Sequence, residues 1–383
     1  MSTNKYNVLY ICHSIENNGG AFQSLLNMLR ATRHDVSPIV LLPKYSSAAA
    51  EFENNGIPVV ISYFGCNIWN EKKKFREIIR CIPHAIKEIV CRYRTLFKLR
   101  AVIKKYNINV IHSNTGAINI GYYISRRYKV KHVWHLREFQ DLDFNWRPFW
   151  GWNNWYKMLN SSDAVICITD KIKNHFHQVN KPKVYKLWNA VRSVNELKPI
   201  LYNKNDNLLF CASNICEGKG LDTCLYALSK VIERTKVGHL DIIGRFLDKE
   251  YENHIHKIIH ELDLDDHVTF IGYVSDISNY MLESRCFIMS SLNEALGRVT
   301  IEAMFYGCPV IGRNSGGTQE LIIHGQNGFL FNNETELAKL IEMIYSTDLN
   351  EIINNGREFA VSNFSEESYK GAILSIYNDT FSK

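Results

Sequence analysis

One local pattern occurs twice in this chain, once near its start and once past its middle. An apolar run at 7–12 precedes a loop with two adjacent glycines and a helical pattern over 21–29. The same order returns with an apolar run at 207–212, a loop at 213–220 and a helical pattern from Leu221. A strand, a glycine-containing loop and a helix form the first unit of nucleotide-binding α/β folds. The repeat predicts two Rossmann-like domains, and 383 residues suit two domains of usual size.

The stretch at 286–331 carries the densest pattern in the sequence. The apolar run Cys286–Met289 is typical of a strand that is buried on both faces. A polar loop follows, and then helical spacing over 297–306, which Gly307 and Pro309 bring to an end. A further strand pattern comes next. This order of elements builds a parallel sheet.

Two acidic residues lie where such a sheet binds its ligands. Glu294 comes just after the carboxyl end of the strand, and Glu302 lies in the first turns of the helix. The backbone N–H groups of Gly297, Arg298 and Val299 lie at the helix start, where free donors and the helix dipole favour phosphate. A carboxylate there can accept hydrogen bonds from sugar hydroxyls. The alternative is that Arg298 and Glu302 form a surface i,i+4 ion pair and Glu294 is a solvated loop residue.

This stretch resembles the Glu-x7-Glu signature of the retaining glycosyltransferases of family 4, which have the GT-B fold. The matching residues are Ser290, Ser291, Glu294, Gly297, Arg298, Val299, Glu302, Ala303, Met304, Gly307, Pro309, Val310, Gly316, Gly317, Glu320, Asn327 and Gly328. The resemblance implies an α/β protein with two Rossmann-like domains whose parallel sheets face a cleft. It also implies transfer of a sugar from a nucleotide-diphosphate sugar to an acceptor hydroxyl, with anomeric retention.

The resemblance also implies a division of the chain. Residues 1–195 would form the N-terminal acceptor domain, 196–206 the linker, and 207–365 the C-terminal donor domain. Residues 366–383 would form a C-terminal helix that crosses back to the N-terminal domain.

Lys219 is the cation that the resemblance places on the diphosphate of the donor. An ammonium beside a helix N-terminus suits that role. The family usually has an arginine at the position of Asn214. One cationic contact is therefore missing, unless Arg298 or Arg245 supplies it. Tyr273 opens a loop that meets the nucleotide base through backbone groups in the family.

Three residues of the N-terminal half complete the expected site. Gly19 and Gly20 would face the donor sugar and phosphate, although an ordinary tight turn is the alternative. His135 would position the donor sugar from the end of its strand, where a lone histidine is otherwise often structural. His135, Glu294 and Lys219 are thus the expected catalytic residues, with Glu302 holding the ribose.

The expected donor is a UDP- or GDP-sugar, which is a substrate, and no cofactor is expected. No Asp-x-Asp metal motif is assigned, and metal independence is expected. The ten cysteines show no metal-binding spacing, which favours free thiols in a reducing cytosol. No signal-peptide pattern and no apolar run of membrane-spanning length is found, so a cytoplasmic protein is expected.

The segment at 71–105 holds twelve Lys and Arg residues and three Glu, and its apolar residues recur at helical spacing. Pro83 is expected to split it into two helices. A basic amphipathic helix can lie on an anionic membrane surface at the cytoplasmic face. The alternative is an apolar stripe on the sheet with solvated cations. No recognition motif accompanies the charge, so nucleic acid is not expected.

The acceptor is expected to be a lipid-linked glycan of bacterial O-antigen, capsule or related surface polysaccharide synthesis, the group that the sequence most resembles. Rings crowd 144–156, where four of the seven tryptophans lie. Such rings stack on sugars or sit at a lipid interface, or they form a local hydrophobic cluster. Two rival functions are a soluble glycan synthase of the same fold and an inactive scaffold subunit.

Overall fold

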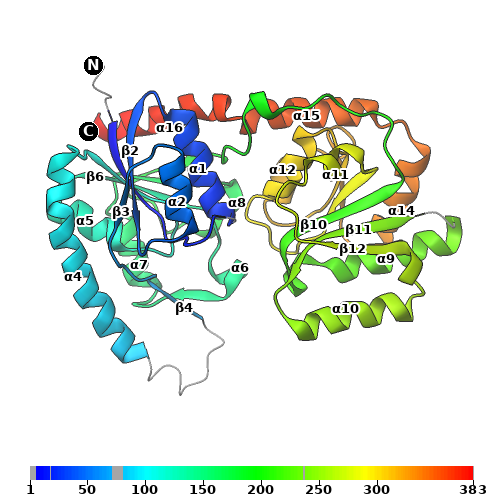
Figure 1. Cartoon of the computed structure of the whole chain (residues 1–383), viewed down its shortest axis with the longest axis horizontal. Coiled ribbons are helices and arrows are strands. Elements are labelled where there is room, and N and C mark those ends of the chain that lie inside the picture. Colours follow the sequence, from blue (N-terminus) through cyan, green and yellow to red (C-terminus); the bar gives the residue numbers. More distant parts are fainter. Residues whose placement is uncertain (1–5, 18, 71–80, 236–237, 383) are drawn as a thin grey trace. The chain divides into compact units, whose positions relative to one another are not determined.

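The structure is a computed structural model that describes residues 6–17, 19–70, 81–235 and 238–382 (Figure 1). The chain divides into two compact units. Unit 1 comprises Met1–Ala190 with Glu366–Lys383, and unit 2 comprises Val191–Ser365. This division falls a few residues before 195, where the N-terminal domain is expected to end. The reason is that Val191 N donates to Phe364 O at 2.8 Å and Arg192 pairs with Ser365, so the chain joins unit 2 at Val191.

Unit 1 is built on a seven-stranded parallel sheet in the order β3-β2-β1-β5-β6-β8-β9. The strand order reverses between β1 and β5, and ligands bind at such switch points in open α/β sheets. The strands are β1 (Tyr6–Ile11), β2 (Val36–Leu42), β3 (Val59–Ile61), β5 (Val110–Ser113), β6 (Lys131–Leu136), β8 (Ala164–Cys167) and β9 (Lys183–Lys186). A separate antiparallel pair joins β4 (Ile68–Asn70) to β7 (Trp146–Pro148).

Helices cover both faces of this sheet because its strands are apolar on both sides. Successive residues of β1 alternate: Val8 packs with α1 and α16, whereas Leu9 packs with α4 and α5. In Figure 1 the red helix α16 lies with the blue elements β2 and α1. The helices are α1 (Gly20–Thr32), α2 (Ser47–Asn54), α4 (Cys81–Lys105), α5 (Ile120–Tyr128), α6 (Asp141–Phe144), α7 (Trp152–Leu159), α8 (Asp170–His175) and α16 (Glu366–Phe381).

Unit 2 has a six-stranded parallel sheet in the order β12-β11-β10-β13-β14-β15, with its own switch point between β10 and β13. The strands are β10 (Asn207–Ile215), β11 (His239–Phe246), β12 (Val268–Gly272), β13 (Cys286–Met289), β14 (Val310–Arg313) and β15 (Phe329–Phe331). The helices are α9 (Leu221–Thr235), α10 (Lys249–Glu261), α11 (Ser278–Glu283), α12 (Arg298–Phe305), α13 (Thr318–Leu321), α14 (Glu334–Ser346) and α15 (Asn350–Phe364). Two Rossmann-like units with parallel sheets are thus confirmed.

The described part of the basic segment forms one helix, α4, from Cys81 to Lys105. Pro83 lies in the first turn of α4. The helix expected before it would fall at 71–80, which lies outside the described residues, so the split stays a prediction. Leu96 and Leu99 of α4 pack toward the sheet, while Val90, Tyr93 and Phe97 are exposed. Across the described residues, no helix is both long and apolar enough to cross a bilayer.

Candidate functional site

Lys219 and Glu294 meet at the switch point of unit 2. Lys219 ends a short 3₁₀ turn, Glu217–Lys219, that follows β10, and Glu294 lies in the loop that follows β13. Lys219 Nζ lies 2.9 Å from Glu294 Oε2, and the two side chains are 33% and 20% exposed. Because β10 and β13 are neighbours, their carboxyl ends bring the two residues together. Glu294 is therefore not a solvated loop residue.

Glycines let three loops pack closely around this pair. A Cβ on Gly220, whose φ is +67°, would lie 2.5 Å from Ser290 O. A Cβ on Gly316, with φ +54°, would lie 2.6 Å from Glu294 O, and Gly317 N donates to that same oxygen at 2.5 Å. Only glycine fits these positions without strain. The loop after β14 thereby packs directly against the backbone of Glu294.

The N-terminus of α12 follows the Glu294 loop directly. Gly297 caps the helix with φ +80°, and Arg298 and Val299 form its first turn. The first N–H groups of an α-helix have no acceptor within the helix, so they are available to an anion. This placement agrees with the roles predicted for Gly297, Arg298 and Val299, which stay predictions.

Glu302 lies in a compact cluster with two arginines. Its Oε1 is 3.2 Å from Arg298 Nη2 and 3.8 Å from Arg192 Nη2, and Arg192 Nη1 is 2.9 Å from Glu196 Oε2. The side chain of Glu302 is 10% exposed and that of Arg298 is 19% exposed. The alternative i,i+4 pair therefore exists, but it is largely buried. Sequence reasoning missed Arg192, because nothing local links it to a residue so far along the chain.

Burial sets the electrostatics of this cluster. It lowers the pKa of Arg298, although Glu302 works in the opposite direction. Burial also acts to lower the pKa of Arg192, but Glu302 and Tyr306 outweigh it and the pKa is raised. Both guanidinium groups stay charged because an arginine pKa starts so high.

Arg245 and Tyr273 lie one and two strands away from Lys219, at the same edge of the sheet. Arg245 is the parallel register partner of Asn214, and its Nε donates to Asn214 Oδ1 at 3.0 Å. Its guanidinium carbon is 5.8 Å from the centroid of the Tyr273 ring. The structure thus gathers Lys219, Glu294, Arg245 and Tyr273 at the carboxyl edge of one sheet.

His135 belongs to unit 1 and is buried. Its Nδ1 lies 3.2 Å from His112 Nε2, and His112 Nδ1 lies 2.8 Å from the Tyr377 hydroxyl of α16. Burial, with Arg137 adding to the effect, lowers the pKa of both histidines well below the usual value, so both are neutral. His135 Nε2 has no hydrogen-bond partner among the described residues. His135 is therefore part of a buried chain of polar contacts in unit 1. Its role in positioning the sugar stays a prediction.

Gly19 and Gly20 lie at the N-terminus of α1, beside the β1/β5 switch point. Gly19 has φ −78°, which any residue adopts, and a Cβ on either glycine would meet no atom within 4 Å. Neither backbone strain nor packing in unit 1 requires glycine here.

A buried polar group at the end of β6 was not predicted. The Thr115 hydroxyl donates to Glu138 Oε1, and Arg137 Nε donates to Asn114 Oδ1 at 2.9 Å. Burial raises the pKa of Glu138 to about 7, against the hydrogen bond from Thr115. Gln140 is fully buried with φ +68°, and its amide atoms have no partner among the described residues.

The aromatic segment packs as a local cluster around Trp155. This ring is 1% exposed, its Nε1 donates to Gly116 O at 3.0 Å, and its centroid is 4.9 Å from that of Phe176. Trp150, in contrast, is 45% exposed. The hydrophobic-cluster alternative thus holds for the buried part of the segment.

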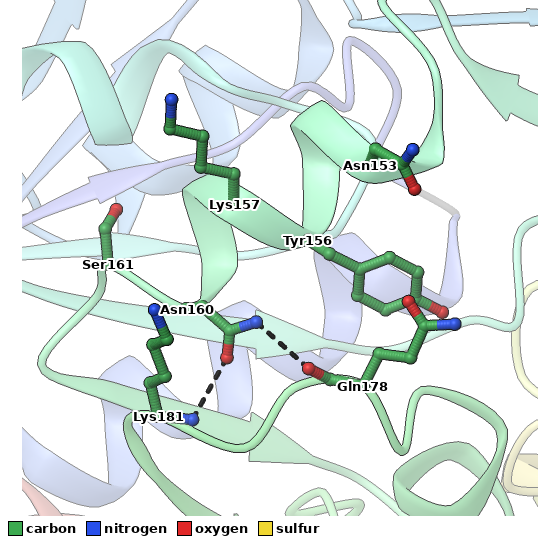
Figure 2. Close-up of a pocket in the computed structure, with 7 residues that line it drawn as sticks. All are labelled: Asn153, Tyr156, Lys157, Asn160, Ser161, Gln178 and Lys181. Atoms are coloured by element: carbon green, nitrogen blue, oxygen red, sulfur yellow. Dashed lines mark hydrogen bonds between the residues drawn. The ribbon is translucent and has the colours of Figure 1, made fainter.

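Figure 2 shows a hollow of about 460 Å³ in unit 1, next to this cluster. Asn160 stabilises its wall, since its amide donates to Gln178 O and accepts from Lys181 N, each at 3.0 Å. The hollow lies before β8 and β9, at the amino edge of the sheet, and none of the predicted site residues lines it. The lining residues are Asn153, Tyr156, Lys157, Asn160, Ser161, Gln178 and Lys181.

Two Asp-x-Asp sequences, at 141–143 and 263–265, do occur in the chain, and sequence reasoning overlooked them. Three of their four carboxylates have local partners. Asp141 binds His175 Nε2 at 2.8 Å, and Asp143 accepts from Phe139 N at 2.8 Å. In the second, Asp265 lies 3.4 Å from His260. In the described residues, no group of three His, Cys, Asp or Glu side chains could hold a metal ion.

Comparison with known proteins gives two family matches that together span most of the chain. The family "Glycosyltransferase Family 4" matches residues 18–192, and "Glycosyl transferases group 1" matches residues 195–359. An uncharacterized glycosyltransferase of Methanocaldococcus jannaschii is 26% identical over 81% of this chain and 87% of its own length. A lipopolysaccharide core biosynthesis glycosyltransferase of Rhizobium meliloti is 29% identical over 56% of this chain and 64% of its own.

Solved structures are similar over nearly the whole chain. HepE from Anabaena, in complex with UDP and glucose, has a TM-score of 0.75 and 20% identity, and the match covers 97% of this chain and 99% of that one. TarM has a TM-score of 0.78 and 13% identity, and the match covers 98% of this chain and 99% of that one. At these identities the likeness establishes the fold.

The two Rossmann-like units and the likeness to these solved structures define the GT-B fold. The chain belongs to the group 1 glycosyltransferases, because the group 1 model matches residues 195–359 and the Glycosyltransferase Family 4 model matches residues 18–192.

Proposed function

We propose that this enzyme transfers a sugar, with retention of anomeric configuration, from a UDP- or GDP-sugar to a lipid-linked glycan. The observation that carries the proposal is the Lys219–Glu294 pair, 2.9 Å apart, at the unit 2 switch point and beside the N-terminus of α12. HepE, which shares the fold, was solved with UDP and with UDP-glucose, and this supports a nucleotide-sugar donor.

The proposed roles follow from the charge that develops in the reaction. The bond from the sugar carbon to the diphosphate oxygen breaks, the sugar becomes oxocarbenium-like, and negative charge grows on the diphosphate. Lys219 and the free N–H groups of α12 stabilise that charge, because they are fixed before the reaction begins. The acceptor oxygen bonds to the sugar carbon and its proton passes to an oxygen of the leaving diphosphate.

The carboxylates bind the donor in this proposal. Glu294 accepts hydrogen bonds from sugar hydroxyls, and donor binding exchanges part of its ion pair with Lys219 for contacts with the ligand. Glu302 accepts hydrogen bonds from the ribose hydroxyls. The ion pairs with Arg298 and Arg192 hold the Glu302 carboxylate in place. His135 helps to position the sugar. The cations that stabilise the diphosphate are protein side chains, so we propose a metal-independent enzyme without a cofactor.

A thermal-shift panel with UDP, GDP, ADP and CMP tests the donor site, because a ligand that binds the folded state raises the melting temperature. We expect one nucleotide to stabilise the protein. Lys219→Ala should lower turnover at least ~10-fold, since a charged contact contributes about 1.5–3 kcal/mol. Lys257→Ala, an exposed lysine, is the control and should change neither property. No response to any nucleotide would favour the inactive-scaffold alternative.

Retention and metal independence have direct assays. The anomeric configuration of the product, followed by NMR from the first turnovers, should match that of the donor sugar. Activity should survive dialysis against EDTA without loss. An inverted product, or activity restored only by a divalent cation, would contradict these parts of the proposal.

The exposed side of α4 supports a lipid-linked acceptor at the cytoplasmic face of a membrane. Phe97 is 80% exposed, Tyr93 66% and Val90 43%, at spacings that place them on one side of the helix. Arg94 and Arg100, both exposed, flank these residues. Aromatic side chains flanked by cations are typical of a helix that lies in the lipid interface.

Vesicle sedimentation tests this surface of α4. Phe97→Ser should weaken binding to vesicles that contain anionic lipid about tenfold, while Tyr226→Ser, a tyrosine of α9 that is 43% exposed, should leave binding unchanged. Full activity on free oligosaccharides without any vesicle binding would instead identify the enzyme as a soluble glycan synthase.

A further inference from the structure

One side of α7 is polar, although the surrounding segment is rich in aromatic rings. Asn153, Tyr156, Lys157 and the C-cap Asn160 follow one another at spacings of three, one and three residues, which places them on one side of the helix. Trp155, on the opposite side, is buried. The polar side forms one wall of the hollow in Figure 2. A polar helix side alone is ordinary, but here a second segment lies across from it.

The loop between α8 and β9 forms the other wall, and Asn160 ties it to α7. The Asn160 amide donates to Gln178 O at 3.0 Å, and its Oδ1 accepts from the backbone N–H groups of Asn180 at 2.9 Å and Lys181 at 3.0 Å. Val179, only 7% exposed, anchors the same loop in unit 1. The two walls are therefore fixed relative to each other. The hollow between them, about 460 Å³, has the size of a small-molecule site.

The lining of the hollow is positively charged. It contains Lys157 and Lys181 and no carboxylate, and in Figure 2 both lysines lie on the same side of the hollow as Ser161. Arg126 adds a third cation, since its Nη2 lies 3.4 Å from Ser161 O. Among the described residues, neither lysine forms an ion pair or a side-chain hydrogen bond. Both ammonium groups can therefore bind an anion without giving up a partner in the protein.

The uncharged part of the lining suits a sugar. The amides of Asn153 and Gln178 can each donate and accept, as the hydroxyl groups of a sugar require. Tyr156 supplies an aromatic ring against which the apolar side of a sugar can pack. The ring of Trp152, with its centroid 6.1 Å from that of Tyr156, supports this ring from within the aromatic segment. Together with the lysines, these groups match a ligand that carries both hydroxyl groups and negative charge.

We propose that this hollow is a second carbohydrate site, and that it binds an acidic sugar, one with a phosphate or a carboxylate group. It lies at the amino edge of the unit 1 sheet, whereas the ligands of open α/β sheets bind at the carboxyl edge. Its ligand is therefore distinct from the nucleotide that unit 2 is proposed to bind. The inference goes beyond the proposed function and does not depend on it, because it requires neither a donor nor a transfer step.

Isothermal titration of the full chain tests the ligand class with four probes. Glucose 6-phosphate and glucuronate carry the two kinds of anion on a sugar, while glucose and inorganic phosphate each lack one half of the expected ligand. We expect at least one acidic sugar to bind with a dissociation constant below about 20 mM, and glucose and phosphate to bind about tenfold more weakly. The affinity should fall as salt is added. A saturating nucleotide should not displace the acidic sugar.

Variants of the lining locate the binding. The double variant Lys157→Ala/Lys181→Ala should weaken the acidic sugar about tenfold, because it removes two charged contacts. Tyr156→Ala should reduce the affinity for the acidic sugar to that of inorganic phosphate, because only the anion would still be recognised. Lys104→Ala/Lys105→Ala is the matched control, since it removes two exposed lysines from the end of α4, and it should bind like the parent. The melting temperature of each variant shows whether it is folded.

Four results would overturn the proposal. If no acidic sugar binds, the hollow is not a carbohydrate site. If inorganic phosphate binds as tightly as the acidic sugars and Tyr156→Ala changes nothing, the lysines attract anions without recognising a sugar. If the folded double variant Lys157→Ala/Lys181→Ala binds like the control, the sugar binds elsewhere. If UDP or GDP displaces the acidic sugar, the probe occupies the proposed donor site instead of the hollow.

Discussion

The cluster of Arg192, Arg298 and Glu302 allows a test of unit 2 that is independent of catalysis. The perturbation is Glu302→Leu, compared with Arg298→Leu and with the double variant. Glu302→Leu leaves Arg298 without its carboxylate partner, while Arg192 keeps its ion pair with Glu196. Arg298→Leu still leaves Glu302 with Arg192, 3.8 Å away. The two single variants should therefore differ in their effect on the free energy of unfolding.

The expected size follows from burial. Removing one partner of a fully buried ion pair costs about 3–5 kcal/mol. Because these side chains retain 10% and 19% exposure, we expect about 2–4 kcal/mol for Glu302→Leu and about 1–2 kcal/mol for Arg298→Leu. The double variant should lose less than the sum, with a coupling energy of about 1–2 kcal/mol.

The distribution of tryptophan makes the assay specific to one unit. All seven tryptophans lie at or before Trp188, in unit 1, so intrinsic fluorescence in a urea titration follows that unit alone. Far-UV circular dichroism follows both units. With a slope of about 2 kcal/mol per molar urea, Glu302→Leu should lower the midpoint of the unit 2 transition by about 1–2 M. The fluorescence transition should stay where it is.

A double-mutant cycle on the exposed ion pair of Lys257 and Glu261 provides the control. These side chains are 71% and 58% exposed at 3.4 Å, and their coupling should stay below about 0.5 kcal/mol. If Glu302→Leu shifts the transition no more than this exposed pair does, the cluster does not stabilise unit 2. If the fluorescence transition moves equally, the two units unfold together and the reasoning about separate probes is wrong.

Two further predictions concern stability. Gly316→Ala should destabilise unit 2 by about 1–3 kcal/mol in the same titration, because φ is +54° and the new Cβ would lie 2.6 Å from Glu294 O, whereas Gly19→Ala meets open space and should be neutral. Glu138→Gln should stabilise unit 1 more at pH 8 than at pH 5. Burial raises the folded-state pKa of Glu138 to about 7, so the folded protein loses stability as pH rises from about 4.5 to 7 and the carboxyl ionises, and glutamine avoids that loss. An equal effect of Glu138→Gln at both pH values would contradict this.

The sequence predicted those parts of the site that follow from strand ends. The apolar runs before Lys219 and Glu294 mark two strands, and the carboxyl ends of parallel strands meet at one edge, so both residues could be assigned to one site. The ion pair between them could not be predicted, because the neighbour relation of β10 and β13 depends on the strand order of the whole sheet. The same holds for Arg192, whose contact with Glu302 depends on where the chain joins unit 2.

Helix α4 shows a second limit. Its apolar residues were interpreted as one stripe, yet Leu96 and Leu99 pack inward while Val90, Tyr93 and Phe97 face away from the sheet. Two apolar groups on opposite sides of one helix overlap in a linear pattern. Only the position of the sheet separates them, and this position is a tertiary property.

The membership of α16 in unit 1 has a consequence for synthesis on the ribosome. Tyr369, Ile373, Ile376 and Tyr377 complete one face of the unit 1 core, but they are translated after every residue of unit 2. Unit 2 is continuous in sequence, so it can fold as soon as it has emerged. The first half of the chain must wait with one side of its sheet uncovered, and we expect nascent chains at that stage to be the form that chaperones bind and proteases cut.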